Sequence, residues 1–154
     1  KLVDSSYTYT VESITVTGAK GGTATYTFGG TEGKGGNWNI TGSAPASGYS
    51  YTFDNTVTAK DGIYDYTQND NSLMLYPQSL TDAKIIVKYK TEKDNATFFN
   101  ASKEVSLTGE WTNGQSIRYI LTLPVGAEEM SVNTTYDENW DATDNEQTPK
   151  NPAS

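Results

Sequence analysis

The side chains of this sequence that could act in catalysis are its carboxylates. The 154 residues include 19 Asp and Glu but no His and no Cys, which excludes thiol nucleophiles, His general bases and the Ser-His-Asp arrangement. Paired carboxylates of the kind that hydrolyse glycosides remain open, yet no spacing singles out a pair. Six aspartates lie in turn-like stretches, where Asp commonly closes turns: Asp54, Asp61, Asp65, Asp70, Asp82 and Asp94. The sequence therefore predicts no catalytic residue and a protein that is not an enzyme.

One acidic stretch near the C-terminus is similar to the start of a calcium-binding loop. Asp137, Asn139 and Asp141 place oxygen ligands at alternate positions. The sixth position is Ala142, where such a loop needs Gly, and the twelfth is Thr148, where a bidentate Glu belongs. A calcium site here is a hypothesis beside the interpretation we favour, a solvated acidic tail. Because His and Cys are absent, the usual zinc and haem ligands are missing too, and no cofactor is predicted.

The aromatic residues offer a different chemistry, which is stacking against the faces of sugars. The chain has 11 Tyr, 4 Phe and 3 Trp. Trp38 lies beside a Gly-rich stretch and is the candidate for an exposed glycan platform. Trp111 precedes the most regularly alternating segment, so we expect it to be buried as a core or corner residue.

The overall composition is that of a folded β protein. Tyr and Thr favour strands, and strong helix formers are scarce along most of the chain. A formal net charge of -8 would repel phosphate, so a nucleic-acid partner is not expected. No apolar run approaches the roughly 18 residues that a membrane-spanning helix needs, and no transmembrane segment is predicted.

Apolar and polar residues alternate in short runs separated by Gly, Asn, Asp and Pro, which predicts strands. The first strand is Tyr7 to Thr17, with a bulge near Glu12 and Ser13, where its inward-facing set changes phase. The other expected strands lie near residues 24–28, 49–53, 56–59, 72–76, 84–90, 104–108, 117–123 and 130–134. This pattern predicts an all-β fold, a two-sheet antiparallel β-sandwich over residues 1–141, followed by a polar C-terminal tail at 142–154.

Two stretches resemble the fimbrillin family. In the first, an apolar strand runs into Pro-Gln, a turn and a strand that ends in Tyr. In the second, a Trp-x-x-Gly turn precedes a Tyr-rich strand, with Ile117 where the family's pattern usually has its first Tyr. The residues that carry the resemblance are Leu73, Leu75, Pro77, Gln78, Tyr89, Trp111, Gly114 and Tyr119. The order and separation of the two stretches match the family as well.

This resemblance implies a transthyretin-like, Greek-key sandwich that serves as a type V pilus subunit or a related surface adhesin. Family members are exported as lipoproteins, are anchored in the outer membrane in precursor form, and assemble by donating a strand to a neighbour after a proteolytic cut. They usually have two sandwich domains, so the resemblance implies that this chain is a fragment or a reduced form. The physical basis of such assembly is an open sheet edge, whose unpaired N–H and C=O groups pair with another chain.

We therefore expect a structural or adhesive component of bacterial fimbriae at the cell surface. Its expected partners are other pilin or adhesin subunits bound by strand addition, and a host protein or glycan. This function requires an unpaired edge beside an apolar groove. The alternative is a secreted carbohydrate-binding module, which requires two or three exposed coplanar aromatic faces. A third hypothesis is a small glycan-active hydrolase, which requires two carboxylates in one cleft.

Overall fold

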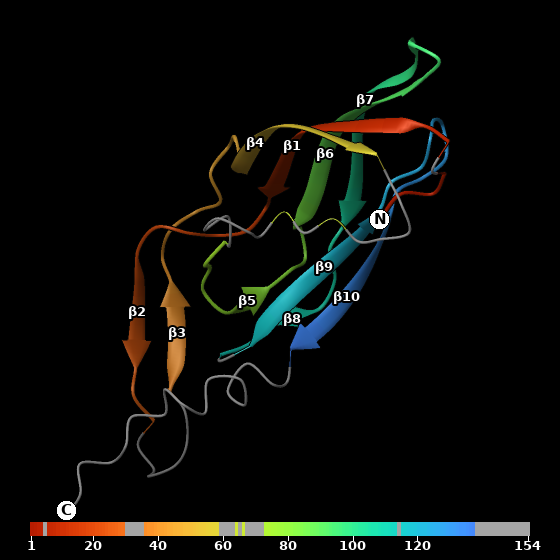
Figure 1. The fold of residues 1–154 in the computed structure, drawn as a ribbon. Coiled ribbons are helices and arrows are strands. Elements are labelled where there is room, and N and C mark those ends of the chain that lie inside the picture. Colours follow the sequence, from red (N-terminus) through yellow and green to blue (C-terminus); the bar gives the residue numbers. More distant parts are fainter. Residues whose placement is uncertain are drawn as a thin grey trace, which may run out of the picture.

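The computed structural model describes residues 1–4, 6–29, 36–58, 64, 66, 73–113 and 115–137 (Figure 1). Within these ranges the chain forms strands and no helix. The strands are β1 (Thr8–Thr17), β2 (Ala24–Thr27), β3 (Asn37–Ile40), β4 (Tyr49–Thr58), β5 (Gln78–Ser79), β6 (Lys84–Lys93), β7 (Ala96–Ser106), β8 (Glu110–Trp111), β9 (Ser116–Thr122) and β10 (Ser131–Asp137). The all-β class predicted from the sequence is confirmed.

A four-stranded antiparallel sheet in the order β4-β1-β6-β7 is the largest unit. Its inner face packs against the β9–β10 hairpin, whose Leu121 and Val132 contact the core. The short β5–β8 ladder lies near this hairpin, and the β2–β3 hairpin stands to one side (Figure 1). Among the described residues the strands form four separate antiparallel sheets, one of four strands and three of two, so the second layer is built from short pairs.

The bulge predicted in the first strand is confirmed. The register of β1 shifts between Val11 and Ser13 against both of its neighbours. Before the shift Tyr9 and Val11 are buried, and after it Ile14 and Val16 pack against the same core. The extra residue therefore keeps the apolar side chains of β1 on one face, although their alternation in the sequence changes phase.

The core is centred on β6. Ile85, Val87 and Tyr89 are buried on its inner face, as the alternation predicted. The Tyr89 hydroxyl donates a hydrogen bond of 2.8 Å to the carbonyl of Pro124, in the β9–β10 connection. The Thr91 hydroxyl donates to the Val125 carbonyl at 2.7 Å. These two bonds tie the large sheet to the second layer at a place where unpaired polar groups would be costly.

The hairpin between β6 and β7 turns at Asp94 and Asn95. Both residues have a positive φ, of 52° and 62°. A two-residue turn with positive φ at both positions matches the right-handed twist of its strands, and Asp and Asn tolerate this conformation better than other side chains. The turn-forming role predicted for Asp94 is confirmed. The same role predicted for Asp54 is wrong, because Asp54 lies within β4.

The prediction of a strand at residues 72–76 is wrong for residues 73–76, which form no strand. The alternation there reflects half-buried Leu73 and Leu75 around Met74, which is 93% exposed. Pairing begins only after Pro77, since proline has no N–H to donate and is tolerated just before a strand. The sequence also failed to predict β3 and β8, and β7 begins at Ala96, well before the segment predicted at 104–108.

Several sequence predictions lie outside the described residues. These are the tail at 142–154, the turn at residues 61–62 and the turn roles of Asp65 and Asp70. Among the residues that the structure describes, no helix is long and apolar enough to cross a membrane.

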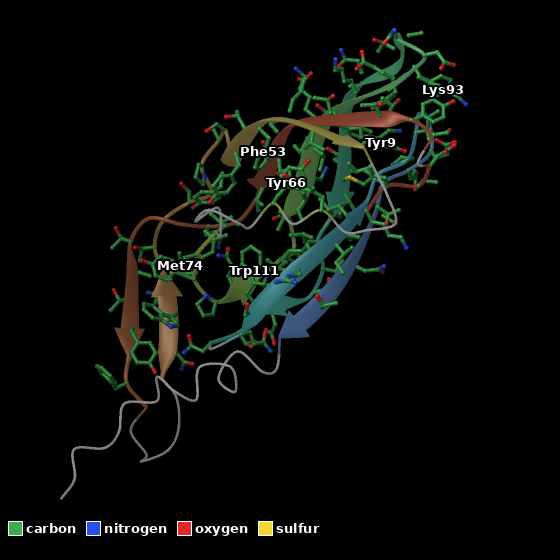
Figure 2. The ribbon with its side chains drawn as sticks, viewed as in Figure 1. Tyr9, Phe53, Tyr66, Met74, Lys93 and Trp111 are labelled. Atoms are coloured by element: carbon green, nitrogen blue, oxygen red, sulfur yellow. The ribbon has the colours of Figure 1, made fainter. Side chains whose placement is uncertain are left out.

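Buried tyrosines should make the fold sensitive to alkali. Burial raises the pKa of Tyr89 and of Tyr66, whose ring packs edge-on against Phe53 at 4.6 Å (Figure 2). The pKa of each tyrosine in the folded state lies above the ordinary value of 10. The free energy of unfolding is therefore constant below pH 10. It falls above pH 10, because there the tyrosines ionise readily only in the unfolded chain. We expect the free energy of unfolding to drop by up to about 1.4 kcal/mol per pH unit for each tyrosine. Urea unfolding at pH 8, 10 and 11 measures this, and an equal slope in Tyr66→Phe would contradict the assignment to Tyr66.

Candidate functional site

The outer edge of β7 is a sheet edge that no described residue pairs with. Leu107 donates its N–H to the Ala83 carbonyl at 2.8 Å, which marks these opposite residues as a hydrogen-bonded pair. Bonded and non-bonded pairs alternate along an antiparallel ladder. The register between β6 and β7 therefore gives two sets of backbone N–H and C=O groups on β7. One set faces β6 and belongs to Phe99, Ala101, Lys103 and Val105. The other set faces outward and belongs to Asn100, Ser102, Glu104 and Ser106. None of the described residues pairs with this outward row.

The inner face of β7 is firmly attached to the core. Phe99 packs against Tyr89 with ring centroids 5.0 Å apart, and Val105 contacts the buried cluster. The Lys103 ammonium lies 5.1 Å from the centre of the Phe99 ring and donates to the Glu128 carbonyl at 2.6 Å. The edge is thus held in an extended shape, so pairing with another strand would require little further ordering.

The first part of β7 has few of the features by which proteins protect sheet edges. Residues 96–102 read Ala-Thr-Phe-Phe-Asn-Ala-Ser, with no charge, no Pro and no Gly. Charged side chains come only at Lys103 and Glu104, and a register shift falls near Phe98, which is 64% exposed. Charge, proline and bulges are the usual means of blunting an edge. This edge has one register shift, near Phe98, and one pair of oppositely charged neighbours, Lys103 and Glu104. Most of its length therefore carries none of the features that block pairing.

The residues that carry the fimbrillin resemblance fall into two groups in space. Gln78 in β5 lies directly opposite Trp111 in β8, and the half-buried Trp111 indole donates to the Tyr119 hydroxyl at 2.7 Å. The two stretches, about thirty residues apart in the chain, are therefore in contact. Trp111 also packs against the core, in line with the corner role predicted for it.

The remaining residues of this set are less closely connected. Tyr89 lies in the main core, and Leu73, Leu75 and Pro77 are half-buried beside β5. Gly114 lies outside the described residues.

Gln78 fastens the connection between β1 and β2. Its amide oxygen accepts the Lys20 N–H at 2.7 Å, and its amide nitrogen donates to the Lys20 carbonyl at 3.0 Å. The same nitrogen donates to the Tyr76 carbonyl at 3.1 Å. A primary amide carries a donor and an acceptor side by side, so it can pair with a backbone N–H and C=O in this two-way manner. The sequence motif marked Gln78 without revealing this role, because Lys20 is 58 residues away.

We expect Gln78→Ala to lower the free energy of unfolding by about 1–3 kcal/mol, because three hydrogen bonds, two exposed and one part-buried, are lost together. Ser79→Ala is the matched control, since among the described residues the exposed hydroxyl of this neighbouring residue bonds Thr81 alone, and we expect a change within about 0.5 kcal/mol. Urea denaturation followed by circular dichroism measures both. Equal losses for the two variants would show that the amide pairing with Lys20 contributes nothing.

Trp38, the predicted glycan platform, lies in β3 and is 37% exposed. Its ring packs against Tyr26 at 5.0 Å with a tilt of 52°, and against Tyr76 at 5.3 Å with a tilt of 43°. Its indole N–H donates to the Asn113 side chain at 3.1 Å. The rings are not coplanar, which disfavours the flat multi-ring platform that the carbohydrate-module alternative requires.

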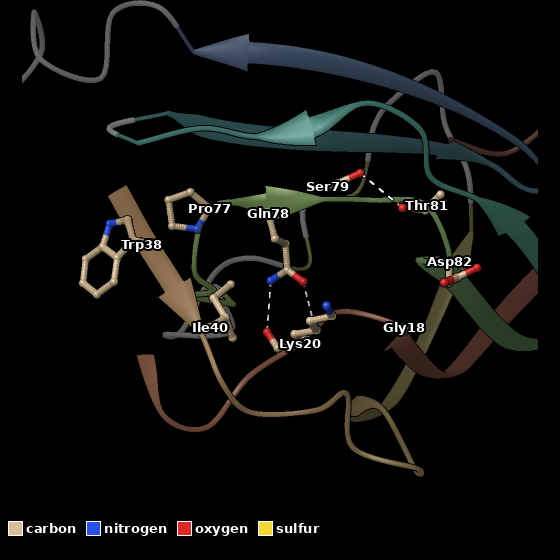
Figure 3. Close-up of a pocket in the computed structure, with 9 residues that line it drawn as sticks. All are labelled: Gly18, Lys20, Trp38, Ile40, Pro77, Gln78, Ser79, Thr81 and Asp82. Carbon is tan, nitrogen blue, oxygen red and sulfur yellow. Dashed lines mark hydrogen bonds between the residues drawn. The ribbon is translucent and has the colours of Figure 1, made fainter. Parts of the chain in front are cut away.

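A hollow of about 310 Å³ lies next to Trp38 (Figure 3). Trp38, Ile40 and Pro77 line one end, and Thr81 and Asp82 line the other. The apolar groove expected beside an unpaired edge is not this hollow, since β7 contributes no residue to its lining.

The carboxylates of the described residues serve mainly as partners of lysines and backbone groups. Glu12 pairs with Lys88 at 2.6 Å, Glu104 with Lys84 at 2.7 Å and Glu92 with Lys90 at 3.0 Å. Asp4 accepts the Ser6 N–H at 2.8 Å, and this bond lowers the pKa of its carboxyl.

No group of three or more Asp or Glu that could hold a metal ion occurs in the part of the chain that the structure describes. The residues of the hypothesised calcium site lie almost wholly outside the described part of the chain. Asn139 and Asp141 are not described, and of Asp137 only its backbone, at the end of β10, is placed.

The sequence did not single out β7 as an edge. The signal that could have found it is the uncharged, aromatic-containing stretch at residues 96–102, which is typical of segments prone to pair with other strands. Which strand lies at the edge depends on the order β4-β1-β6-β7, and no local pattern encodes that order. Comparison of the chain with protein-family models, with curated proteins and with solved structures found no match.

Proposed function

We propose that this protein is a structural or adhesive component of bacterial surface fimbriae and that it works by strand pairing at the outer edge of β7. The observation that carries the proposal is the outward row of backbone groups on Asn100, Ser102, Glu104 and Ser106, which no described residue satisfies. A row of this kind accepts another strand through main-chain hydrogen bonds. The resemblance to fimbrillins, which assemble by strand addition, supports the same function.

The chemistry of the edge suits a protein partner. Phe98, which is 64% exposed, offers apolar contact area beside this row, and the uncharged side chains of Asn100 and Ser102 present no charge that would repel an added strand. The simplest partner is the β7 edge of a second copy, since antiparallel pairing about a two-fold axis places the same residues on both sides. We propose that such contacts join subunits at the cell surface and that the protein carries no catalytic activity.

Sedimentation velocity of the purified chain over a wide concentration range tests this function. We expect the monomer to give way to dimers or longer assemblies as concentration rises, and we expect a synthetic peptide of residues 96–106 to slow that growth by competing for the edge. Antibody labelling of intact source cells tests the location. A chain that stays monomeric at every concentration, ignores the peptide and is absent from the cell surface would contradict the proposal.

A further inference from the structure

We propose that two copies of this chain pair through their β7 edges in one register, with the two Ser102 residues directly opposite each other. This pairing rests on the function proposed above, that β7 accepts an added strand, and specifies which strand is added and how it is aligned. It joins two β4-β1-β6-β7 sheets, in each of which β7 is an edge strand, into one continuous sheet (Figure 1). A two-fold axis occupies both β7 edges, so this contact produces a closed dimer.

The backbone of β7 limits the registers that two copies can share. The outward N–H and C=O groups belong to the even-numbered residues from Asn100 to Ser106. In an antiparallel pair, residues that exchange both hydrogen bonds lie directly opposite each other. An even-numbered residue of one copy must therefore lie opposite an even-numbered residue of the other. The two-fold axis then passes between a residue and its own counterpart.

The regular part of β7 reduces the choice to two registers. Its pairing with β6 is continuous from Phe99 to Ser106, and a register shift falls near Phe98. Because a bulge interrupts a ladder, the longest regular contact has its axis at Ser102 or at Lys103. An axis at Lys103 places two lysines directly opposite each other, and like charges in that position are destabilising. An axis at Ser102 places no two charged residues opposite each other, and we therefore infer this register.

The side chains on the core face of β7 match in the Ser102 register. Phe99 of one copy lies opposite Val105 of the other, and both side chains are only half-buried in the single chain. An aromatic residue opposite a β-branched residue is a favourable cross-strand pair. Ala101 lies opposite Lys103 of the second copy, so a small side chain faces a long one. The dimer thus covers apolar surface that the single chain leaves partly in water.

The side chains on the solvent face of β7 are also complementary. Asn100 lies opposite Glu104 of the second copy, and its amide can donate to that carboxylate, which already pairs with Lys84 at 2.7 Å. The two Ser102 hydroxyls meet at the axis, where they can hydrogen-bond to each other. Two-fold symmetry repeats every contact, so on the order of six main-chain hydrogen bonds hold the strands together.

Disulfide cross-linking tests the register, because the chain has no Cys of its own. Opposite residues that exchange hydrogen bonds have Cα atoms about 5.5 Å apart, within the range of a disulfide. The two copies of residue 100 would be more than about 13 Å apart along the strands. We therefore expect Ser102→Cys to form a linked dimer by itself under mild oxidation. Asn100→Cys and Glu104→Cys should link to each other at least ten-fold faster than either links to itself.

Thr25→Cys is the matched control for random collision, because Thr25 is an exposed strand residue outside β7. Circular dichroism confirms that each variant is folded. Preferred linkage in another combination, such as Ser102→Cys with Glu104→Cys, would overturn the register and leave pairing at the β7 edge intact. If no β7 cysteine links faster than Thr25→Cys, pairing of two copies at this edge fails altogether, and the function proposed above fails with it.

The linked Ser102→Cys dimer provides a second measurement. Both of its β7 edges are occupied, so a fluorescent peptide of residues 96–106 should bind it at least ten-fold more weakly than it binds the reduced monomer. Fluorescence anisotropy measures both affinities. Equal binding would show that the disulfide formed without strand pairing and would overturn the register.

Discussion

Ser102→Pro should weaken self-association at least ten-fold while leaving the monomer folded. The N–H of Ser102 faces outward from β7 and makes no bond to β6, so the substitution removes a donor that only an added strand would use. Proline is tolerated on edge strands where the lost N–H faces solvent, and it is one of the natural means of blocking an edge. Sedimentation velocity gives the association constant, and the free energy of unfolding of the monomer should change by less than about 1 kcal/mol.

Ala101→Pro is the matched control for this edge. Ala101 is the preceding residue, lies opposite Tyr89, and uses its backbone groups for the β6 ladder. Proline there removes a bond inside the sheet, so we expect a loss of about 2 kcal/mol or more in the free energy of unfolding. Equal destabilisation by the two prolines would contradict the assignment of inward and outward backbone groups. Unchanged association of a stable Ser102→Pro variant would show that subunits meet elsewhere.

Tyr89→Ala should have the largest effect on stability, a loss of about 3–5 kcal/mol. Tyr89 is fully buried, its ring lies 6.1 Å from that of Tyr9 and 5.0 Å from that of Phe99, and its hydroxyl bonds the Pro124 carbonyl. Since domains of this size are stable by only about 5–15 kcal/mol, the variant should be largely unfolded under mild denaturing conditions. Urea denaturation monitored by circular dichroism measures the loss.

Two conservative variants separate the ring from its hydroxyl. Tyr89→Phe keeps the ring but leaves the buried Pro124 carbonyl without its donor, so we expect a loss of about 1–3 kcal/mol. Tyr66→Phe removes a buried hydroxyl that has no hydrogen-bond partner among the described residues, so we expect a change within about 0.5 kcal/mol or a slight gain. A loss for Tyr89→Phe no larger than that for Tyr66→Phe would show that the bond to Pro124 does not help join the layers.

Local pattern was sufficient to predict the strands with regular alternation. Tyr9, Val11, Ile85, Val87 and Tyr89 are spaced two apart within their strands and all are buried, and the change of phase in β1 does mark a bulge. The prediction failed where alternation arose for another reason. Leu73 and Leu75 alternate with an exposed Met74, but no strand among the described residues pairs with them, because pairing depends on what lies alongside.

The candidate site was harder to predict, because it depends on contacts between residues far apart in the chain. Trp38 was identified from its Gly-rich neighbourhood, whereas Asp82 at the other end of the same hollow was identified only as a turn residue. Gln78 was marked by its motif, but its partner Lys20 was not. The edge position of β7 follows from strand order, which is set by the packing of the whole core and not by the residues of β7 themselves.

Amide hydrogen exchange along β7, measured by NMR on dilute and on concentrated protein, tests strand pairing most directly. In the dilute monomer we expect Asn100, Ser102, Glu104 and Ser106 to exchange rapidly, while Ala101, Lys103 and Val105 are protected by their bonds to β6. On assembly the four outward amides should slow at least a hundred-fold. Outward amides that are already protected in the monomer, or that stay rapid in the assembled protein, would contradict strand addition at this edge.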